Sequence, residues 1–458
     1  MATIPKSELT TGVTLALVGR VLETRFEDLP GEIVEVARQC LLDWIGVTLA
    51  GTSEPLVETL VDEIAEQGGN PQASLIGRGM KVSMQQAALV NGAASHALDY
   101  DDVHAAHTGH PSVTIIPALL ALAEHRGSSG TEFIEAFTAG YETICRMGRL
   151  VNPDHYEKGF HATATLGAFG AAAACARLMG LDEQQTAYAF GIAGTQASGL
   201  KSMFGTMCKP LHAGLAARNG LLAASLAARG FDSRMDVIEC AQGFAATQSG
   251  DFNVEAAAAD PPGGYHMRAN LFKYHAACYL THAAIESAGR IRAQDGFSPE
   301  SVSEVIVRVN PGCDTVCNIQ EPETGLESKF SLRMTTAFAL AGIDTAVIAN
   351  YNDAHCADPD LVALRDKTTI EFDSEIGRMA SEVRVILDNG IGFAETHDAS
   401  VACADVGEQG QRLEAKFHSL VDGLIGEKAG DGIVSVVGRL EGLEDIGAVI
   451  QACASGSG

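Results

Sequence analysis

The residues best suited to chemistry gather in one stretch, SHALDYDDVHAAHTGHPS, at positions 95–112. It contains seven imidazoles and carboxylates, namely His96, Asp99, Asp101, Asp102, His104, His107 and His110. Such groups exchange protons near neutral pH, bind a substrate or coordinate a divalent metal. Helix capping and loop hydrogen bonding are the structural alternative for the same residue types. We interpret the stretch first as a polar pocket rim that binds or protonates a substrate.

The spacing of three imidazoles also allows a metal site. His104, His107 and His110 recur at every third position, so they could share one face of a helix and bind a divalent ion. Gly109 and Pro111 weaken a helix there. A metal-dependent hydrolase built on these three histidines is therefore the rival from another reaction class.

Two more segments place basic groups in apolar surroundings. Lys209 and His212 lie in FGTMCKPLHAGLAARNG, near the start of an expected helix whose N-terminus attracts anions. Lys209 could hold a substrate carboxylate, or act as an acid or base if burial lowered its pKa. Arg218 fits a carboxylate clamp or a structural ion pair. His161, before an almost purely apolar helix, fits a core histidine or a catalytic base.

A third segment, KYHAACYLTHAAIES, contains a possible nucleophile. Cys278 and His282 are four residues apart, which suits a thiol beside its base on one helical face. The chain has no acyl-transfer signature, so we do not favour nucleophilic catalysis. It also has neither a GxGxxG motif after a strand nor a GxxxxGK[ST] motif. We therefore expect no cofactor and assign the chemistry to side chains.

The elements that position these residues fall into two kinds. Helical spacing and caps run through the first half, with apolar residues at 33–49 and cap pairs at Ser129–Glu132 and Asp182–Gln185. The Ala- and Gly-rich segment 161–179 predicts a central helix that packs closely on its neighbours. After about residue 265, SEVIVRVNPG, KTTIEFDS and SEVRVILDNG alternate like half-buried strands. The last sixty residues look helical again, so we expect a mainly α chain with an α+β unit inserted.

The composition of the chain argues against some classes of function and some cellular locations. The 458 residues include 46% hydrophobic and 19% charged residues, which is typical of a globular protein with two domains or one large helical domain carrying a smaller one. A net charge of -27 argues against nucleic acid or an anionic membrane as the main partner. The sequence MATIPKSELTTGVTLALVGR does not read as a signal peptide, and eleven scattered cysteines suit a reducing compartment. We expect a cytoplasmic protein.

Six separated motifs in this order resemble the MmgE/PrpD family, which contains 2-methylcitrate dehydratases, cis-aconitate decarboxylases and iminodisuccinate epimerases. They are CLLDWIGVTLAG, NGAASHALDYDDVH with GHPS, GFHATATLGAFGAAAA, FGTMCKPLHAGLAARNG, KYHAACYLTH and ESKFSL. The resemblance implies an all-helical domain of residues 1–265 and 396–458, an α+β domain of residues 266–395, a pocket between them, and a homodimer.

The resemblance also implies site residues. Asp99, His110, His161 and Lys209 fall on positions assigned to the active site of cis-aconitate decarboxylases, so we expect them to be catalytic. We expect Lys209 and His212 to bind carboxylates, His161 or Asp99 to act as base, and His110 to donate a proton. We add His104 and Cys278 to the substrate-binding residues.

The expected function is a cofactor-independent lyase, of dehydratase or decarboxylase type, acting on a small di- or tricarboxylic acid. Three positions, Val103, Cys278 and Met334, depart from the decarboxylase pattern. The Cys278 motif looks more like the iminodisuccinate epimerase version, in which Cys278 could be the second base. An epimerase of an iminodisuccinate-like acid and a noncatalytic carboxylate binder are therefore the alternatives, beside the metal-dependent hydrolase.

Overall fold

The computed structural model describes residues 12–454 and divides the chain into two compact units. The larger unit comprises residues 1–270 and 404–458, and the smaller comprises residues 271–403. The sequence-based boundaries, 266 and 395, lie slightly earlier in the chain. At the first boundary, the short turn η3 (His266–Ala269) packs on helices of the larger unit, and at the second, strand β6 (Gly392–Asp398) continues past residue 395.

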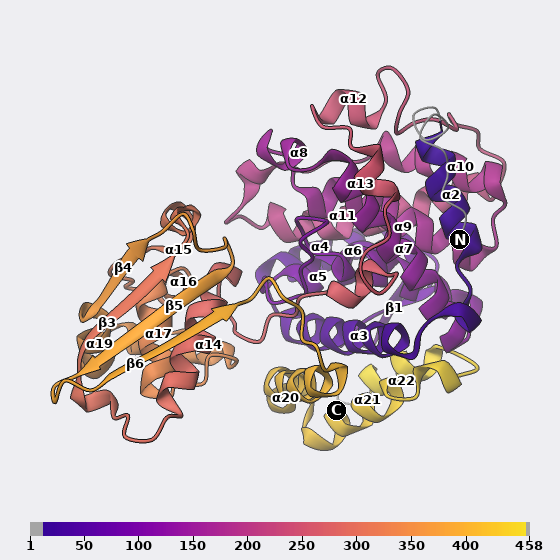
Figure 1. Cartoon of the computed structure of the whole chain (residues 1–458). Helices are drawn as coiled ribbons and strands as arrows, with labels where there is room; N and C mark the ends of the chain where they lie inside the picture. The colour runs from indigo at the N-terminus through magenta and orange to yellow at the C-terminus, as the bar shows by residue number, and fades with distance from the viewer. Residues whose placement is uncertain (1–11, 455–458) are drawn as a thin grey trace. The chain divides into compact units, whose positions relative to one another are not determined.

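The larger unit is built almost entirely from helices (Figure 1). Its longer helices are α2 (Val13–Glu23), α3 (Gly31–Gly51), α4 (Pro55–Gln67), α5 (Met84–His96), α6 (Ser112–Arg126), α7 (Gly130–Val151), α9 (Ala162–Met179), α10 (Glu183–Gly194), α11 (Cys208–Ala227), α20 (Val406–Ile425), α21 (Glu427–Val437) and α22 (Gly447–Ala454). Shorter ones are α8 (Asp154–Glu157), α12 (Phe244–Gln248) and α13 (Val254–Ala258), and a small hairpin joins β1 (Ala73–Leu75) to β2 (Met80–Val82).

Helix α9 lies at the core of this unit. It packs against α6, α7, α10 and α11, and nearly all of its residues are buried. Its small side chains permit the close contact, because a Cβ added to Gly220 of α11 would lie 2.4 Å from the Cβ of Ala171. By length and composition α9 is the one helix within residues 12–454 that could cross a membrane. With 89% of it buried inside the protein, it fits a core helix.

A second close approach joins α5 to α11. A Cβ added to Gly92 would lie 2.7 Å from the Cα of Gly214, and one added to Gly214 would lie 2.1 Å from the carbonyl oxygen of Leu89. Only glycine allows these backbones to meet at this distance. The contact fixes the end of α5, at His96, relative to the start of α11.

Local caps begin two helices at the residues that the sequence indicates. Ser129 accepts a hydrogen bond from the backbone N–H of Glu132, whose side chain in turn accepts from the backbone N–H of Ser129. Asp182 and Gln185 form the same reciprocal pair at the start of α10. Both predicted capping boxes are confirmed.

The smaller unit is an α+β structure with a four-stranded sheet in the order β4-β3-β5-β6. Strand β3 (Val302–Val309) pairs in parallel with β4 (Thr368–Phe372) and antiparallel with β5 (Ala380–Leu387), which pairs antiparallel with β6. Helix α14 (Tyr279–Arg292) packs on β5, β6 and α17 (Leu332–Ala341), and α19 (Pro359–Asp366) packs on α17. Single turns form α15 (Asp314–Cys317), α16 (Gly325–Ser328) and α18 (Asp353–Cys356). The mainly α fold with a smaller α+β part is confirmed.

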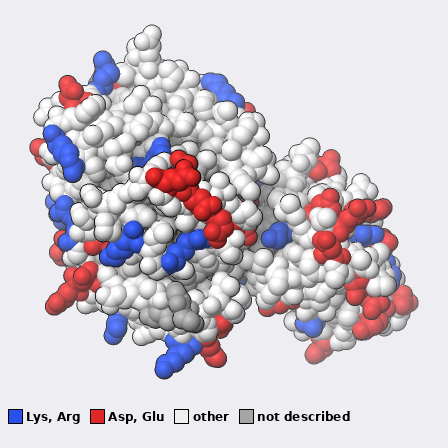
Figure 2. All heavy atoms as spheres, turned by 180° about the vertical axis from the view of Figure 1, so that it is seen from behind, with Lys and Arg blue, Asp and Glu red and all other residues white. Residues whose placement is uncertain are grey.

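The surface reflects the acidic composition. On the face drawn in Figure 2, acidic side chains gather over the smaller unit, whereas the larger unit shows lysine and arginine side chains as well as acidic ones. An anionic ligand would therefore need locally basic groups in its own site.

Candidate active site

Three segments of the larger unit bring the predicted polar residues together. His96 ends α5, and the loop 97–111 follows it before α6 begins. Asp99 in this loop has a left-handed φ of 51°, which turns the chain sharply just after the helix. His161 directly precedes α9, and Lys209 is the second residue of α11.

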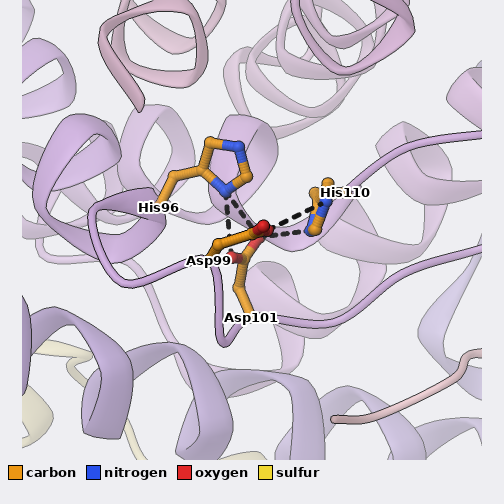
Figure 3. A group of neighbouring side chains, drawn as sticks. All are labelled: His96, Asp99, Asp101 and His110. Atoms are coloured by element: carbon orange, nitrogen blue, oxygen red, sulfur yellow. Dashed lines mark hydrogen bonds and ion pairs between the residues drawn. The ribbon is translucent and has the colours of Figure 1, made fainter. Parts of the chain in front are cut away.

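Asp101 is the buried centre of the group (Figure 3). One of its oxygens lies 2.9 Å from Nδ1 of His96, and the other lies 2.8 Å from Nδ1 of His110. Burial by itself would raise the pKa of Asp101, but the two imidazoles outweigh it and hold that pKa well below its ordinary value. Asp101 is therefore an anion at neutral pH although its side chain is only 1% exposed.

Asp99 links the imidazole of His110 to the ammonium group of Lys209. Its Oδ1 lies 2.9 Å from Nζ of Lys209 and 3.6 Å from Nε2 of His110. The Asp99 side chain is 39% exposed, against 15% for Lys209 and 12% for His110. The structure thus brings three of the four predicted catalytic residues into direct contact, and Asp99 is the member most open to a ligand.

His161 is the fourth predicted catalytic residue, and it pairs with His212. Their Nδ1 atoms lie 3.1 Å apart, so only one of the two can carry the shared proton. Burial, followed by the charges of His96 and Lys209, holds the pKa of His161 well below its ordinary value. Burial also lowers the pKa of His212. Both rings are therefore neutral at pH 7, and each can accept a proton when a substrate brings negative charge.

The prediction that His104, His107 and His110 form a metal-binding helical face is wrong. Residues 97–111 form a loop with a short bridge between His104 and Gly109, so the three rings share no helical face. Nε2 of His107 lies 3.0 Å from the carbonyl oxygen of Ala162. Burial lowers the pKa of His107 to about 3.

His104, which the sequence predicts to bind substrate, has a backbone partner at each ring nitrogen. Its Nε2 donates to the carbonyl oxygen of His266 at 2.9 Å, and its Nδ1 accepts from the backbone N–H of Ala106 at 3.1 Å. Burial lowers the pKa of His104 to about 4. Both ring nitrogens thus bind backbone groups that hold the loop, and a role for His104 in substrate binding stays a prediction.

Two other predicted residues lie outside this group. The Arg218 guanidinium donates to Oδ1 of Asn219 at 3.1 Å and is not part of the cluster. Cys278 belongs to the smaller unit, where it immediately precedes α14 and its backbone N–H donates to the carbonyl oxygen of Lys329. A role for Cys278 in substrate binding stays a prediction.

Sequence reasoning did not select His96 and Asp101 among the site residues, although both lie in the motif it singled out. Spacing alone cannot separate them from Asp102, the next residue. Asp102 accepts hydrogen bonds from the hydroxyl group of Ser112 at 2.6 Å and from the thiol of Cys40 at 3.8 Å. Burial raises its pKa to about 7. Asp102 therefore joins the loop to α3 and α6, whereas Asp101 faces the imidazoles.

His96, Asp99, Asp101 and His110 also have the ligand types of a divalent metal site, with one ligand atom from each lying within 4.8 Å of the others. This is the one such group within residues 12–454. Lys209 already neutralises Asp99, and both oxygens of Asp101 already face ring nitrogens. An added cation would face the ammonium group of Lys209, so the arrangement suits proton transfer better than metal binding.

Comparison with known proteins identifies the family to which the chain is similar. The MmgE/PrpD N-terminal domain matches residues 16–257, and the MmgE/PrpD C-terminal domain matches residues 275–441. Similar proteins include a cis-aconitate decarboxylase-like protein, oryM, from Aspergillus oryzae, 35% identical over 238 residues, which are 50% of this chain and 49% of that protein. The chain thus spans about half the length of this relative.

Two further relatives match over nearly their full length. The cis-aconitate decarboxylase of Aspergillus terreus is 26% identical over 474 residues, covering 97% of this chain and 96% of that enzyme. The cis-aconitate decarboxylase of Mus musculus is 25% identical over 459 residues, covering 94% and 91%. Together the two domain matches extend from residue 16 to residue 441, and the chain belongs to the MmgE/PrpD family.

Proposed function

We propose that this protein is a cofactor-independent lyase, of decarboxylase or dehydratase type, that acts on a small di- or tricarboxylic acid. The observation that carries the proposal is the contact of Asp99 with both Lys209 and His110, which joins a cation to two acid–base groups. The names of the relatives, all cis-aconitate decarboxylases or similar to them, support the same reaction type.

Lys209 is the proposed carboxylate-binding group. Its ammonium group lies at the start of α11, and its partner Asp99 is the exposed member of the pair. A substrate carboxylate can replace Asp99 as the ion-pair partner, with His212 as a second donor. The positive charge then stabilises the carbanion or enediolate that develops beside the carboxylate.

The acid and base follow from the same geometry. In a decarboxylation, the electron pair of the broken C–C bond stays on the substrate carbon as CO₂ leaves, and the imidazolium form of His110 supplies the proton from Nε2. In a dehydration, Asp99 or the neutral His161 removes the C–H proton, and His110 protonates the departing hydroxyl group. Each acid–base group would contribute roughly a hundredfold to ten-thousandfold in rate.

The test is proton NMR of the purified protein in deuterated buffer with methylcitrate, citrate, cis-aconitate, iminodisuccinate and tartrate. We expect deuterium beside a carboxylate together with loss of CO₂ or water from one of these acids. Exchange with inversion and no elimination would instead show an epimerase, with Cys278 as a candidate second base. Binding of these acids without exchange or product would overturn the proposal in favour of a noncatalytic binder.

We also propose that the protein is a cytoplasmic homodimer. The family resemblance supports the dimer, and the eleven free cysteines suit a reducing compartment. Light scattering on the purified chain should give twice the mass of one chain, and a monomer at micromolar concentration would contradict the proposal.

A further inference from the structure

Asp101 has no role in the mechanism above, yet it is the most constrained carboxylate in the site. Both of its oxygens face ring nitrogens, with Nδ1 of His96 at 2.9 Å and 3.1 Å and Nδ1 of His110 at 2.8 Å (Figure 3). Its side chain is 1% exposed, so it cannot reach a ligand directly. Any effect of Asp101 on the reaction must pass through one of the two imidazoles.

An ionised carboxylate can only accept hydrogen bonds, so the group next to it must supply a proton. Nδ1 of His110 lies 2.8 Å from Asp101 as an ion-pair contact and not as an aligned hydrogen bond. So short a contact with a carboxylate is attractive only if Nδ1 carries a proton, so a neutral His110 needs its proton there. Its Nε2 is then free of a proton and lies on the side of Asp99, 3.6 Å from Oδ1. This is the side on which Lys209 lies, and hence the side on which a substrate carboxylate would bind.

We infer that Asp101 is a positioning residue that holds His110 with its proton on Nδ1, so that Nε2 exchanges protons with the substrate. His96 donates its Nδ1–H to Asp101 at 2.9 Å and so holds the carboxylate beside His110. The inference rests on the proposed function for the identity of the reaction, but the tautomer of His110 is a property of the free protein.

The environment of His96 supports its part in this arrangement. Its side chain is fully buried, and burial lowers its pKa to about 4, with Asp101 opposing the shift. At neutral pH it is therefore an uncharged donor, which leaves the negative charge of Asp101 available to the imidazolium form of His110. The second ring nitrogen of His96, Nε2, has no hydrogen-bond partner, so its one polar contact is with Asp101.

The neighbouring carboxylate provides a matched control. Asp102 is also 1% exposed, but its oxygens accept from Ser112 and Cys40 instead of from an imidazole. If burial of a carboxylate in this loop were enough to order His110, Asp101→Asn and Asp102→Asn should have the same effect. If the direct contact matters, only Asp101→Asn should change His110.

The first test is nitrogen NMR of the full-length protein labelled with ¹⁵N-histidine, with His110 assigned by the loss of its signals in His110→Gln. We expect the proton of neutral His110 on Nδ1 in the wild type and in Asp102→Asn. In Asp101→Asn, the amide NH₂ can face the ring, so a large fraction should shift to the Nε2–H form. A wild-type His110 with its proton on Nε2, or an unchanged tautomer in Asp101→Asn, would overturn the inference.

The second test uses a pair of variants at His96, so that it does not depend on the folding of Asp101→Asn. Asparagine places an N–H close to the position of Nδ1, whereas leucine has similar bulk and no donor. With the acid that the wild type converts, we expect kcat of His96→Asn within about threefold of the wild type and of His96→Leu about 10–100-fold lower. Asp101→Asn should lose about 10²–10⁴-fold in kcat.

The two tests separate this inference from the proposed function. If the wild type converts no carboxylic acid, the proposed function fails, while the tautomer of His110 in the wild type and in Asp101→Asn still decides the inference. If the wild type is active and His96→Asn and His96→Leu have equal rates, the positioning role fails and the proposed function stands.

Discussion

At the scale of single residues, the three aspartates of LDYDD show how similar side chains acquire different properties. Asp99 is exposed and paired with Lys209, Asp101 is an anion between two imidazoles, and Asp102 is buried against Ser112 with a raised pKa. The sequence predicts that this motif carries the chemistry. The family resemblance selects Asp99, but the spacing does not separate Asp101 from Asp102, because the left-handed turn at Asp99 sets the direction of the side chains that follow.

The histidines of this segment likewise differ in their contacts although they lie close together in the sequence. His110 and His161 were predicted from the sequence and lie in the cluster, whereas His104 binds backbone groups with both ring nitrogens. The sequence does not predict His96 as a site residue, although its ring contacts Asp101. Histidines one to two turns apart in a helix would share a face, but this segment is a loop, so periodicity gives no information about its side chains.

Lys209→Met should reduce kcat/KM by about 10²–10⁴-fold, because the variant keeps the bulk of the side chain and loses the charge that stabilises the reacting carboxylate. Steady-state kinetics with the acid identified by NMR would measure this loss. Lys158→Met is the matched control, since Lys158 is 46% exposed and pairs only locally with Asp154. Equal activity of the two variants would contradict a binding role for Lys209.

Asp102 should make stability depend on pH. Burial raises its pKa in the folded protein to about 7, above the ordinary value of 3.8, so the folded state binds the extra proton between these values. The contribution of Asp102 to the free energy of unfolding is fully present below about pH 4. It falls by up to about 4 kcal/mol as the pH rises to about 7. Asp102→Asn removes this dependence.

The Tm difference between Asp102→Asn and the wild type should therefore be more positive at pH 8 than at pH 5. Thermal unfolding followed by circular dichroism at the two pH values would measure it. Because both proteins share every other titrating group, the difference isolates Asp102. A Tm difference that is the same at both pH values would show that Asp102 is ionised in the folded protein throughout this range.

At the scale of elements, helices with local sequence signals are predicted correctly, whereas a strand with few buried residues is not. The capping boxes at Ser129 and Asp182 depend on neighbours in the sequence, and the Ala- and Gly-rich composition of α9 indicates its central position. Strand β6 was not predicted. It is an edge strand whose residues alternate between exposed and half-buried, so it lacks the apolar periodicity that marks the other strands.

Gly214→Ala should destabilise the protein and disturb the site. The new methyl group would meet the carbonyl oxygen of Leu89 at 2.1 Å, which forces α11 away from α5. We expect a loss of about 1–3 kcal/mol in stability, because the close backbone contact cannot adjust without a shift. Activity should fall as well, since His96 and Lys209 lie on these two helices.

Gly432→Ala on α21 is the control for this effect. Nothing lies within 4 Å of a Cβ added there, so the substitution should raise stability by about 0.5–1 kcal/mol through helix propensity alone. Chemical denaturation of both variants would give the comparison. If Gly214→Ala were as stable as Gly432→Ala, close packing of α5 on α11 would not be what positions the site.

At the scale of the whole molecule, the protein is strongly acidic, whereas its family suggests a small anionic substrate. Such a substrate can bind only where a cationic side chain is available. The net charge of -27 repels anions at long range, and Lys209, paired with Asp99, is the cation in this cluster that could bind a carboxylate. The length of the chain indicates two domains or one large helical domain carrying a smaller one, and the change of pattern near residue 265 indicates a boundary in the sequence. The reaction could not be predicted at this scale, because family membership defines a group of related proton-transfer reactions and leaves the substrate open.

Activity should survive exhaustive treatment with EDTA followed by gel filtration. Lys209 neutralises Asp99 and would repel a metal cation at this group, so we expect the reaction to need no added cation. The measurement is the rate of acid conversion together with the metal content of the same sample. Loss of activity that returns only with a divalent metal would favour a metal-dependent reaction at His96, Asp99, Asp101 and His110.

We propose that the cluster around Asp99 transfers a proton to or from a carbon beside a carboxylate. The most direct measurement is the rate of deuterium incorporation at that carbon in deuterated buffer, compared between His110→Asn and His418→Asn, a variant of a half-exposed histidine on α20. We predict a loss of about 10²–10⁴-fold for His110→Asn and a wild-type rate for His418→Asn. A wild-type rate of incorporation in His110→Asn would show that His110 does not transfer this proton.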